Sequence, residues 1–205
     1  MEGVMGVVLA GGLSRRMGGQ DKSLLLFAGQ PLLKHALARF APQVNGIMIS
    51  ANGDPSRFDG YGLTVIRDAR PNHLGPMAGI EAAFLATDAS WLMSVPVDLP
   101  FLPHDLVARL CQVLENGRPV PVMATSRGRV HPVVCLWPRE ALPALSAALD
   151  AGERRLLDWF ANHPHKQVDF TPGTHEPDPF FNLNDPVAKD LAEQWISSPT
   201  GGVAA

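Results

Sequence analysis

Short apolar segments alternate along the first half of the chain with segments whose apolar residues recur at helical spacing. The predicted strands are residues 4–10, 46–52, 63–68 and 91–97. The predicted helices are residues 31–40, 78–87 and 105–115. Strands that alternate with helices favour a mostly parallel sheet covered on both faces.

The second half is less regular but uses the same kinds of element. The predicted strands there are residues 120–125 and 130–137, and the predicted helices are residues 140–149, 154–162 and 187–195. Asn184-Asp185-Pro186 is typical of a cap before the last of these helices. No repeat and no linker divides the chain, so residues 1–195 are predicted to form one domain, with residues 196–205 as a flexible C-terminal tail. The predicted fold class is α/β, a three-layer α/β/α arrangement with a mostly parallel, Rossmann-like sheet.

Composition narrows the class of protein. The chain has 205 residues, of which 46% are hydrophobic and 18% charged, so it carries enough apolar material for a core. The net charge is −3 and no basic run suggests nucleic-acid binding. No signal peptide and no apolar run of membrane-spanning length is apparent, so a cytoplasmic monomer with no membrane partner is expected. Cys111 and Cys135 form no CxxC pair and are expected to be buried, reduced thiols.

The first strand leads into the run most typical of ligand binding, LAGGLSRRMGGQDK. Its candidate binding residues are Leu9, Ala10, Gly11, Gly12, Arg16 and Lys22. Glycines let the backbone approach a ligand, and successive unpaired N–H groups can form an anion-binding concavity. Arg16 and Lys22 supply positive charge that suits a triphosphate.

Two better-known phosphate motifs do not match this run. The lysine is preceded by Asp21, so the glycine that a P-loop requires before its lysine is missing. The G-x-G-x-x-G spacing of dinucleotide-binding folds is also absent after this strand. From local chemistry alone, an ordinary glycine-rich surface loop stays an alternative.

A second candidate group follows the fourth predicted strand. Asp98 comes directly after residues 91–97, between Pro96 and Pro100, which stiffen the backbone. Ligands of open α/β sheets bind at the carboxyl ends of the strands, and Mg²⁺ prefers a few carboxylates together with phosphate oxygens and water. The alternative is that Asp98 caps a helix beginning near Pro103.

Polar residues also follow the two other strands of this half. Ser50 and Asn52 are two residues apart, so their side chains are expected on one face, and Asp68 ends the next strand. All three could line a nucleotide pocket, or they could be ordinary polar residues at strand ends.

The run LAGGLSRRMGGQDK closely resembles the N-terminal signature of the molybdenum cofactor guanylyltransferases, which belong to the nucleotidyltransferase fold. Cytidylyltransferases acting on the same cofactor typically have Leu-Ala-Ala-Gly there, so Gly11 favours guanine. The stretch VPVDLPFLP is similar to the family's D-x-P-F segment, whose aspartate binds the metal, although the family more often has cysteine where Val97 stands. The resemblance extends over residues 7–191.

The resemblance implies roles for further residues. It assigns GTP binding to residues 9–12, Lys22, a polar residue after the second strand (Ser50 or Asn52), Asp68, Asp98, and Gly79 in a G-P-x-A-G-like loop. Molybdopterin is implied near His131-Pro132-Val133, Arg154 and Arg155, and Asn182 and Asn184, where Asp185 replaces the usual threonine. The arginine pair could equally be a solvated helix face. His35, His163 and His165 show no ligand spacing and are expected to be packed or solvated.

The implied reaction transfers GMP from GTP to the terminal phosphate of molybdopterin and releases pyrophosphate. Asp98 is the expected Mg²⁺ ligand, with Lys22 and Arg16 as catalytic cations. Transient contact with molybdenum cofactor biosynthesis proteins or acceptor molybdoenzymes is a further expectation. Two alternatives stay open: a cytidylyl- or sugar-phosphate nucleotidyltransferase of the same fold, and a nucleotide-binding protein without turnover.

Overall fold

The computed structural model describes residues 3–11, 21–70, 75–114 and 119–197. Its strands are β1 (Val4–Leu9), β2 (Leu26–Phe27), β3 (Gln30–Pro31), β4 (Gly46–Ser50), β5 (Thr64–Ile66), β6 (Trp91–Pro96), β7 (Val122–Ser126), β8 (Arg129–Pro138) and β9 (Lys166–Asp169). Its α-helices are α1 (Leu32–Phe40), α2 (Pro76–Leu85), α3 (Leu106–Gln112), α4 (Leu142–Asp150), α5 (Leu156–Asn162) and α6 (Pro186–Ser197). The short 3-10 helices are η2 (Lys22–Leu24), η3 (Ala41–Gln43), η4 (Pro55–Tyr61) and η5 (Arg139–Ala141).

Seven strands form the central sheet, in the order β5-β4-β1-β6-β8-β7-β9. Neighbours from β5 to β6 are parallel, as are β7 and β9, whereas β8 runs antiparallel to both β6 and β7. The chain passes from β1 to one side of the sheet and later returns to the other side at β6. This reversal beside β1 is the position at which open α/β sheets bind ligands.

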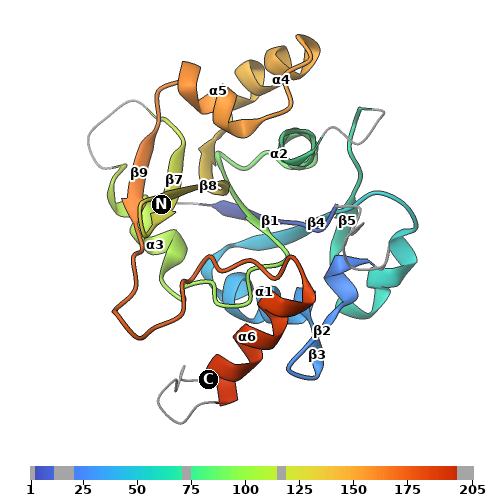
Figure 1. Cartoon of the computed structure of the whole chain (residues 1–205). Helices are drawn as coiled ribbons and strands as arrows, with labels where there is room; N and C mark the ends of the chain where they lie inside the picture. The colour runs from blue at the N-terminus through green and yellow to red at the C-terminus, as the bar shows by residue number, and fades with distance from the viewer. Residues whose placement is uncertain (1–2, 12–20, 71–74, 115–118, 198–205) are drawn as a thin grey trace.

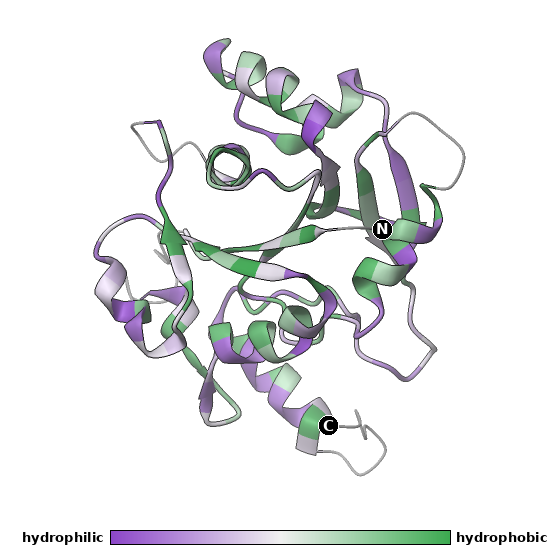
Figure 2. Cartoon of the chain, turned by 180° about the vertical axis from the view of Figure 1, so that it is seen from behind, coloured by the Kyte–Doolittle hydropathy of each residue, from purple (hydrophilic) through white to green (hydrophobic). Residues whose placement is uncertain are grey.

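Helices cover both faces of the sheet, with α2, α4 and α5 on one side and α1, α3 and α6 on the other (Figure 1). Burial follows the same division, because one apolar cluster joins the sheet to α2, α4 and α5 and a second joins it to α1 and α3. Helix α2 is apolar around most of its circumference (Figure 2). The α/β class, with its mostly parallel sheet between helical layers, is confirmed.

The predicted elements occur in the predicted order, with ends that differ by about three residues at most. Strands β2, β3 and β9 and the 3-10 helices η2, η3 and η4 were not predicted. Strand β9 has only one apolar residue in its four positions, Val168, and β2 with β3 is a hairpin of two residues per strand. Helix α6 includes Ile196 and Ser197, so it ends two residues later than predicted.

Among the residues that the structure describes, no helix is both long and apolar enough to cross a membrane.

Candidate functional site

Four strands end level with one another at the reversal point of the sheet. Leu9 of β1 pairs with Ser50 of β4 and with Pro96 of β6, and Ser50 pairs with Ile66 of β5. The residues two positions beyond these ends are Gly11, Asn52, Asp68 and Asp98. The register therefore brings four sequence-predicted site residues to one edge.

Gly11 is exposed where the chain leaves β1. Among the described residues, a Cβ at this position would make only ordinary contacts, 3.8 Å from the Ser50 carbonyl oxygen and 4.0 Å from the Ala51 Cα. The Ala10 N–H donates to the same carbonyl at 2.9 Å, which holds the first residue of the loop against β4. Gly12 and Arg16 lie outside the described residues.

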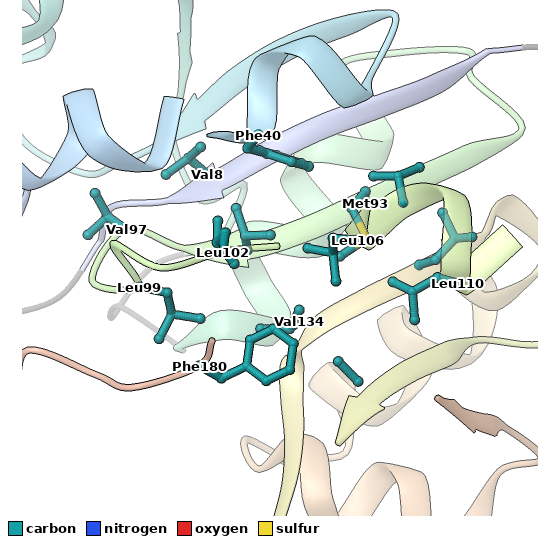
Figure 3. Packing of buried hydrophobic residues seen from close by; sticks show 14 of the residues in the cluster. Val8, Phe40, Met93, Val97, Leu99, Leu102, Leu106, Leu110, Val134 and Phe180 are labelled. Atoms are coloured by element: carbon teal, nitrogen blue, oxygen red, sulfur yellow. The ribbon is translucent and has the colours of Figure 1, made fainter. Parts of the chain in front are cut away.

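Asp98 is a nearly buried carboxylate, with the residue 7% exposed. Its neighbours Val97 and Leu99 are buried in the apolar cluster on the α1 and α3 side, which fixes the backbone that carries it (Figure 3). One carboxylate oxygen pairs with Lys22 Nζ, whereas Oδ1 is buried without a hydrogen-bond partner in the described part of the chain. The helix-cap alternative is wrong, because α3 begins at Leu106 with Asp105 at its N-cap position.

Lys22 opens the 3-10 helix η2, and its ammonium group collects three oxygen acceptors. Besides Asp98, Nζ donates to Asn182 Oδ1 at 3.2 Å and to Asn184 Oδ1 at 2.6 Å. The Leu183 N–H donates to the Asp98 carbonyl oxygen at 3.1 Å, so the C-terminal segment is tied directly to the end of β6. Residues separated by 160 positions in the chain thus form one cluster.

The segment that carries the two asparagines is anchored upstream by Asp178. This carboxylate accepts hydrogen bonds of 2.9 Å from Ser126 Oγ and from the Phe180 N–H. His131 Nε2 lies 2.8 Å from Ser126 Oγ, and its ring packs against Phe180 at 4.6 Å between centroids. Burial lowers the pKa of His131, partly offset by the charge of Asp178. A neutral, packed His131 is therefore part of the support for this segment.

Asn52 and Asp68 are joined by two hydrogen bonds on the side of β1 away from β6. Asn52 Nδ2 donates to Asp68 Oδ2 at 2.8 Å, and the Asp68 N–H donates to Asn52 Oδ1 at 3.1 Å. Ser50 was expected on the same face, but its residue is only 4% exposed and its hydroxyl lies against Gly79 of α2. Asn52 and Asp68 are thus the residues of this set that stand at the open edge.

Gly79 packs so closely against β1 and β4 that a side chain would not fit there. A Cβ there would lie 2.7 Å from Ser50 Oγ and 2.9 Å from Leu9 Cδ2, closer than such contacts allow. The residue lies inside α2 and is buried against β1 and β4. Its small size therefore permits close contact between helix and sheet.

We expect Gly79→Ala to lower the free energy of unfolding by about 1–2 kcal/mol, because overpacking outweighs the gain in helix propensity. Urea denaturation measures the difference. Gly60→Ala is the matched control, since a Cβ there meets nothing within 4 Å. Adding Ser50→Ala to Gly79→Ala should recover part of the loss, and a Gly79→Ala variant as stable as wild type would contradict this account.

The two arginines predicted for molybdopterin are placed differently. Arg154 Nη1 donates to the carbonyl oxygens of Leu149 at 2.9 Å and Glu153 at 2.7 Å, so this guanidinium closes the end of α4. Arg155 precedes α5, with its side chain 74% exposed and 3.8 Å from Asp158. The predicted helix start at Arg154 is thus two residues early, and Arg155 is the more open of the two cations.

The donor set at Asp98 fits a hard divalent cation. The described residues contain no group of three histidine, cysteine or acidic side chains that could hold a metal alone. Mg²⁺ at nucleotide sites usually takes one or two carboxylates, with phosphate oxygens and water completing its shell. The unpartnered Oδ1 of Asp98 at a strand end has the chemistry that such a site requires of its carboxylate.

Comparison with known proteins decides the family. Residues 6–168 match the model of the MobA-like NTP transferase domain. The molybdenum cofactor guanylyltransferase of Shewanella sediminis is 41% identical over 93% of this chain and 96% of its own length. The chain belongs to this family. It is therefore a nucleotidyltransferase, as its N-terminal run predicted.

A second relative agrees with this assignment, and a solved structure shares the fold. The molybdenum cofactor guanylyltransferase of Rhodopseudomonas palustris is 45% identical, covering 91% of this chain and 90% of its own. The fold is shared with molybdopterin-guanine dinucleotide biosynthesis protein A from Archaeoglobus fulgidus, with a TM-score of 0.74 at 20% identity, covering 93% of this chain and 97% of that one.

Two charged residues that lie next to Lys22 and Asn52 were not identified from the sequence. Asp21 and Arg57 form an ion pair, with 2.5 Å between Asp21 Oδ2 and Arg57 Nε. Asp21 stood inside the quoted run but was used only to exclude a P-loop. Arg57 lies in η4, which no pattern predicted, so only the fold brings the two together.

Proposed function

We propose that this protein transfers GMP from GTP to the terminal phosphate of molybdopterin, which forms the guanine dinucleotide form of the cofactor and releases pyrophosphate. The observation that carries the proposal is the convergence of Gly11, Lys22 and Asp98 at one strand edge, next to the Asn52–Asp68 pair. Membership of a family whose relatives carry this activity in their names supports it.

The reaction is a single in-line displacement. An oxygen of the molybdopterin phosphate forms a bond to the α-phosphorus of GTP, and the bond from that phosphorus to the bridging oxygen of the β-phosphate breaks. Pyrophosphate leaves with the electron pair of that bond. The attacking phosphate has a second pKa of about 6, so it is largely dianionic near neutrality and needs no strong general base. Positioning and charge neutralisation supply the catalysis.

In this scheme the open backbone after β1 binds the phosphates, with Gly11 and Gly12 leaving room for them. Lys22 and Arg16 offset the charge that develops on pyrophosphate. Asp98 would hold Mg²⁺, which would supply Lewis-acid polarisation of phosphate oxygens. The support for this role is the buried, unpartnered Oδ1 of Asp98.

The remaining predicted residues are assigned to binding the guanine base and the second substrate, molybdopterin. Asn52 and Asp68 would present an amide and a carboxylate to the donors and acceptors of guanine. Ser50, buried at the end of β4, is assigned to the same half of the site. Asn182 and Asn184 lie at the Lys22 ammonium, where they would face the attacking phosphate. Arg155, whose side chain is exposed, would add positive charge for molybdopterin, whereas the Arg154 guanidinium is occupied at the end of α4.

The proposal is tested by incubating the protein with molybdopterin, Mg²⁺ and each nucleoside triphosphate in turn, and measuring pyrophosphate and dinucleotide. We expect turnover with GTP at least about a hundredfold above that with CTP or UTP, since a site built to hydrogen-bond one base rejects others strongly. Chelation of the metal should stop turnover and added Mg²⁺ should restore it. Preference for CTP or UTP would support the cytidylyl or sugar-phosphate alternative, and GTP binding without pyrophosphate release would support a protein without turnover.

A further inference from the structure

Arg57 stands between the two halves of the site, and its guanidinium makes contacts on both sides. It lies in η4, the segment between β4 and β5. Nε is 2.5 Å from Asp21 Oδ2, and Nη2 donates to the Asn52 carbonyl oxygen at 2.7 Å. Nη1 donates to the Asp54 carbonyl oxygen, and the Phe58 ring packs under the group with 4.5 Å from Cζ to its centroid. Nη1 and Nη2 thus donate hydrogen bonds to backbone carbonyl oxygens, whereas Nε meets Asp21 as an ion pair without an aligned hydrogen bond. The side chain is only 22% exposed.

On the phosphate side, Arg57 acts on the residue that precedes Lys22. Asp21 Oδ1 accepts hydrogen bonds from the Ser23 N–H at 3.0 Å and from Ser23 Oγ at 2.6 Å, which caps the turn that Lys22 begins. The other carboxylate oxygen of Asp21 takes Arg57. Both oxygens are therefore used, and together they fix where the Lys22 turn sits.

On the base side, Arg57 holds the backbone of Asn52. The Asn52 side chain is the one that pairs with Asp68 in both directions. A shift of the Asn52 carbonyl would therefore move the whole pair. The guanidinium connects this pair directly to the Lys22 turn, and its planar fork can contact both at once, which a lysine cannot.

We infer that Arg57 is a positioning residue that sets the separation between the phosphate half and the base half of the nucleotide site. The inference rests on the proposed roles of Lys22 and the Asn52–Asp68 pair. A ligand that spans both halves gains affinity only if the two are correctly spaced. A ligand that occupies one half does not depend on that spacing. Arg57 thus affects GTP but neither guanosine nor pyrophosphate.

The test compares the affinities of GTP, guanosine and pyrophosphate by NMR titration in wild type and in Arg57→Lys, a change that keeps the charge but removes the fork. We expect GTP binding to weaken about tenfold, while guanosine and pyrophosphate change by less than about twofold. Asp21→Asn should have a similar effect on GTP, and the double variant should be little worse than either single one, since both break the same connection.

Arg109→Lys is the matched control. This arginine also packs on a phenylalanine, with 4.0 Å from Cζ to the Phe170 centroid, and donates to a backbone carbonyl, that of Asp169, at 2.6 Å. It should leave all three affinities unchanged. Equal weakening of the three ligands in Arg57→Lys, or no change in GTP, would overturn the inference. Wild-type protein that binds guanosine and pyrophosphate but not GTP would also overturn it, whereas a preference for cytidine over guanosine would contradict the proposed function instead.

Discussion

Asp98→Asn is expected to lower kcat for dinucleotide formation by about a thousandfold, roughly 4 kcal/mol of transition-state stabilisation. The substitution keeps the size of the side chain and one acceptor oxygen, but it replaces the other oxygen with an NH2 donor and removes the charge that a divalent cation requires. Because the proposed metal acts on charge in the transition state, kcat should fall more than the affinity for GTP. Steady-state pyrophosphate release over a range of GTP and Mg²⁺ concentrations measures both quantities.

Stability separates this catalytic effect from simple unfolding. Asp98 Oδ1 is buried without a partner, and Asn182 and Asn184 can still accept from Lys22 when the carboxylate is gone. The free energy of unfolding should therefore stay within about 1 kcal/mol of wild type. Asp105→Asn is the control, since its side chain is 60% exposed and 3.9 Å from Arg109. If Asp98→Asn retained more than about a tenth of wild-type kcat, the metal role assigned to Asp98 would be wrong.

The edge of the sheet was predictable because strand ends carry positional information. One apolar run stops at Gly11 and another stops at Asp98. In a parallel sheet the carboxyl ends of strands lie at one edge, so these two residues are expected at the same edge. The register places Asn52 and Asp68 at that edge as well. These residues are local to their strands, so sequence patterns suffice to find them.

Contacts made by irregular segments were not predictable from patterns. Asn182 and Asn184 reach Lys22 because the Leu183 N–H bonds to the Asp98 carbonyl oxygen, and no periodicity indicates that bond. Only the resemblance pointed to these asparagines, and it implied molybdopterin rather than contact with Lys22. Arg57 was missed for the same reason, since its partners lie on two different loops.

Lys22→Ala is expected to lower kcat/KM for GTP by about a hundredfold or more, because it removes a positive charge placed where pyrophosphate departs. Lys22→Arg should not restore full activity. The ammonium is a compact point charge surrounded by three oxygens, and a planar guanidinium cannot occupy that geometry. Lys189→Ala is the control, since that lysine lies 3.7 Å from Glu193 on α6.

The same substitution has a consequence for folding that distinguishes it from Asp98→Asn. Lys22→Ala leaves a nearly buried carboxylate without the one cation that the described residues place beside it, and this should lower the free energy of unfolding by about 2 kcal/mol. Adding Asp98→Asn removes the stranded charge, so the double variant should be more stable than Lys22→Ala alone while remaining inactive. Excess Mg²⁺ should also raise the melting temperature of Lys22→Ala more than that of wild type, because the lysine no longer competes for Asp98. A double variant less stable than Lys22→Ala would show that the two charges do not depend on each other.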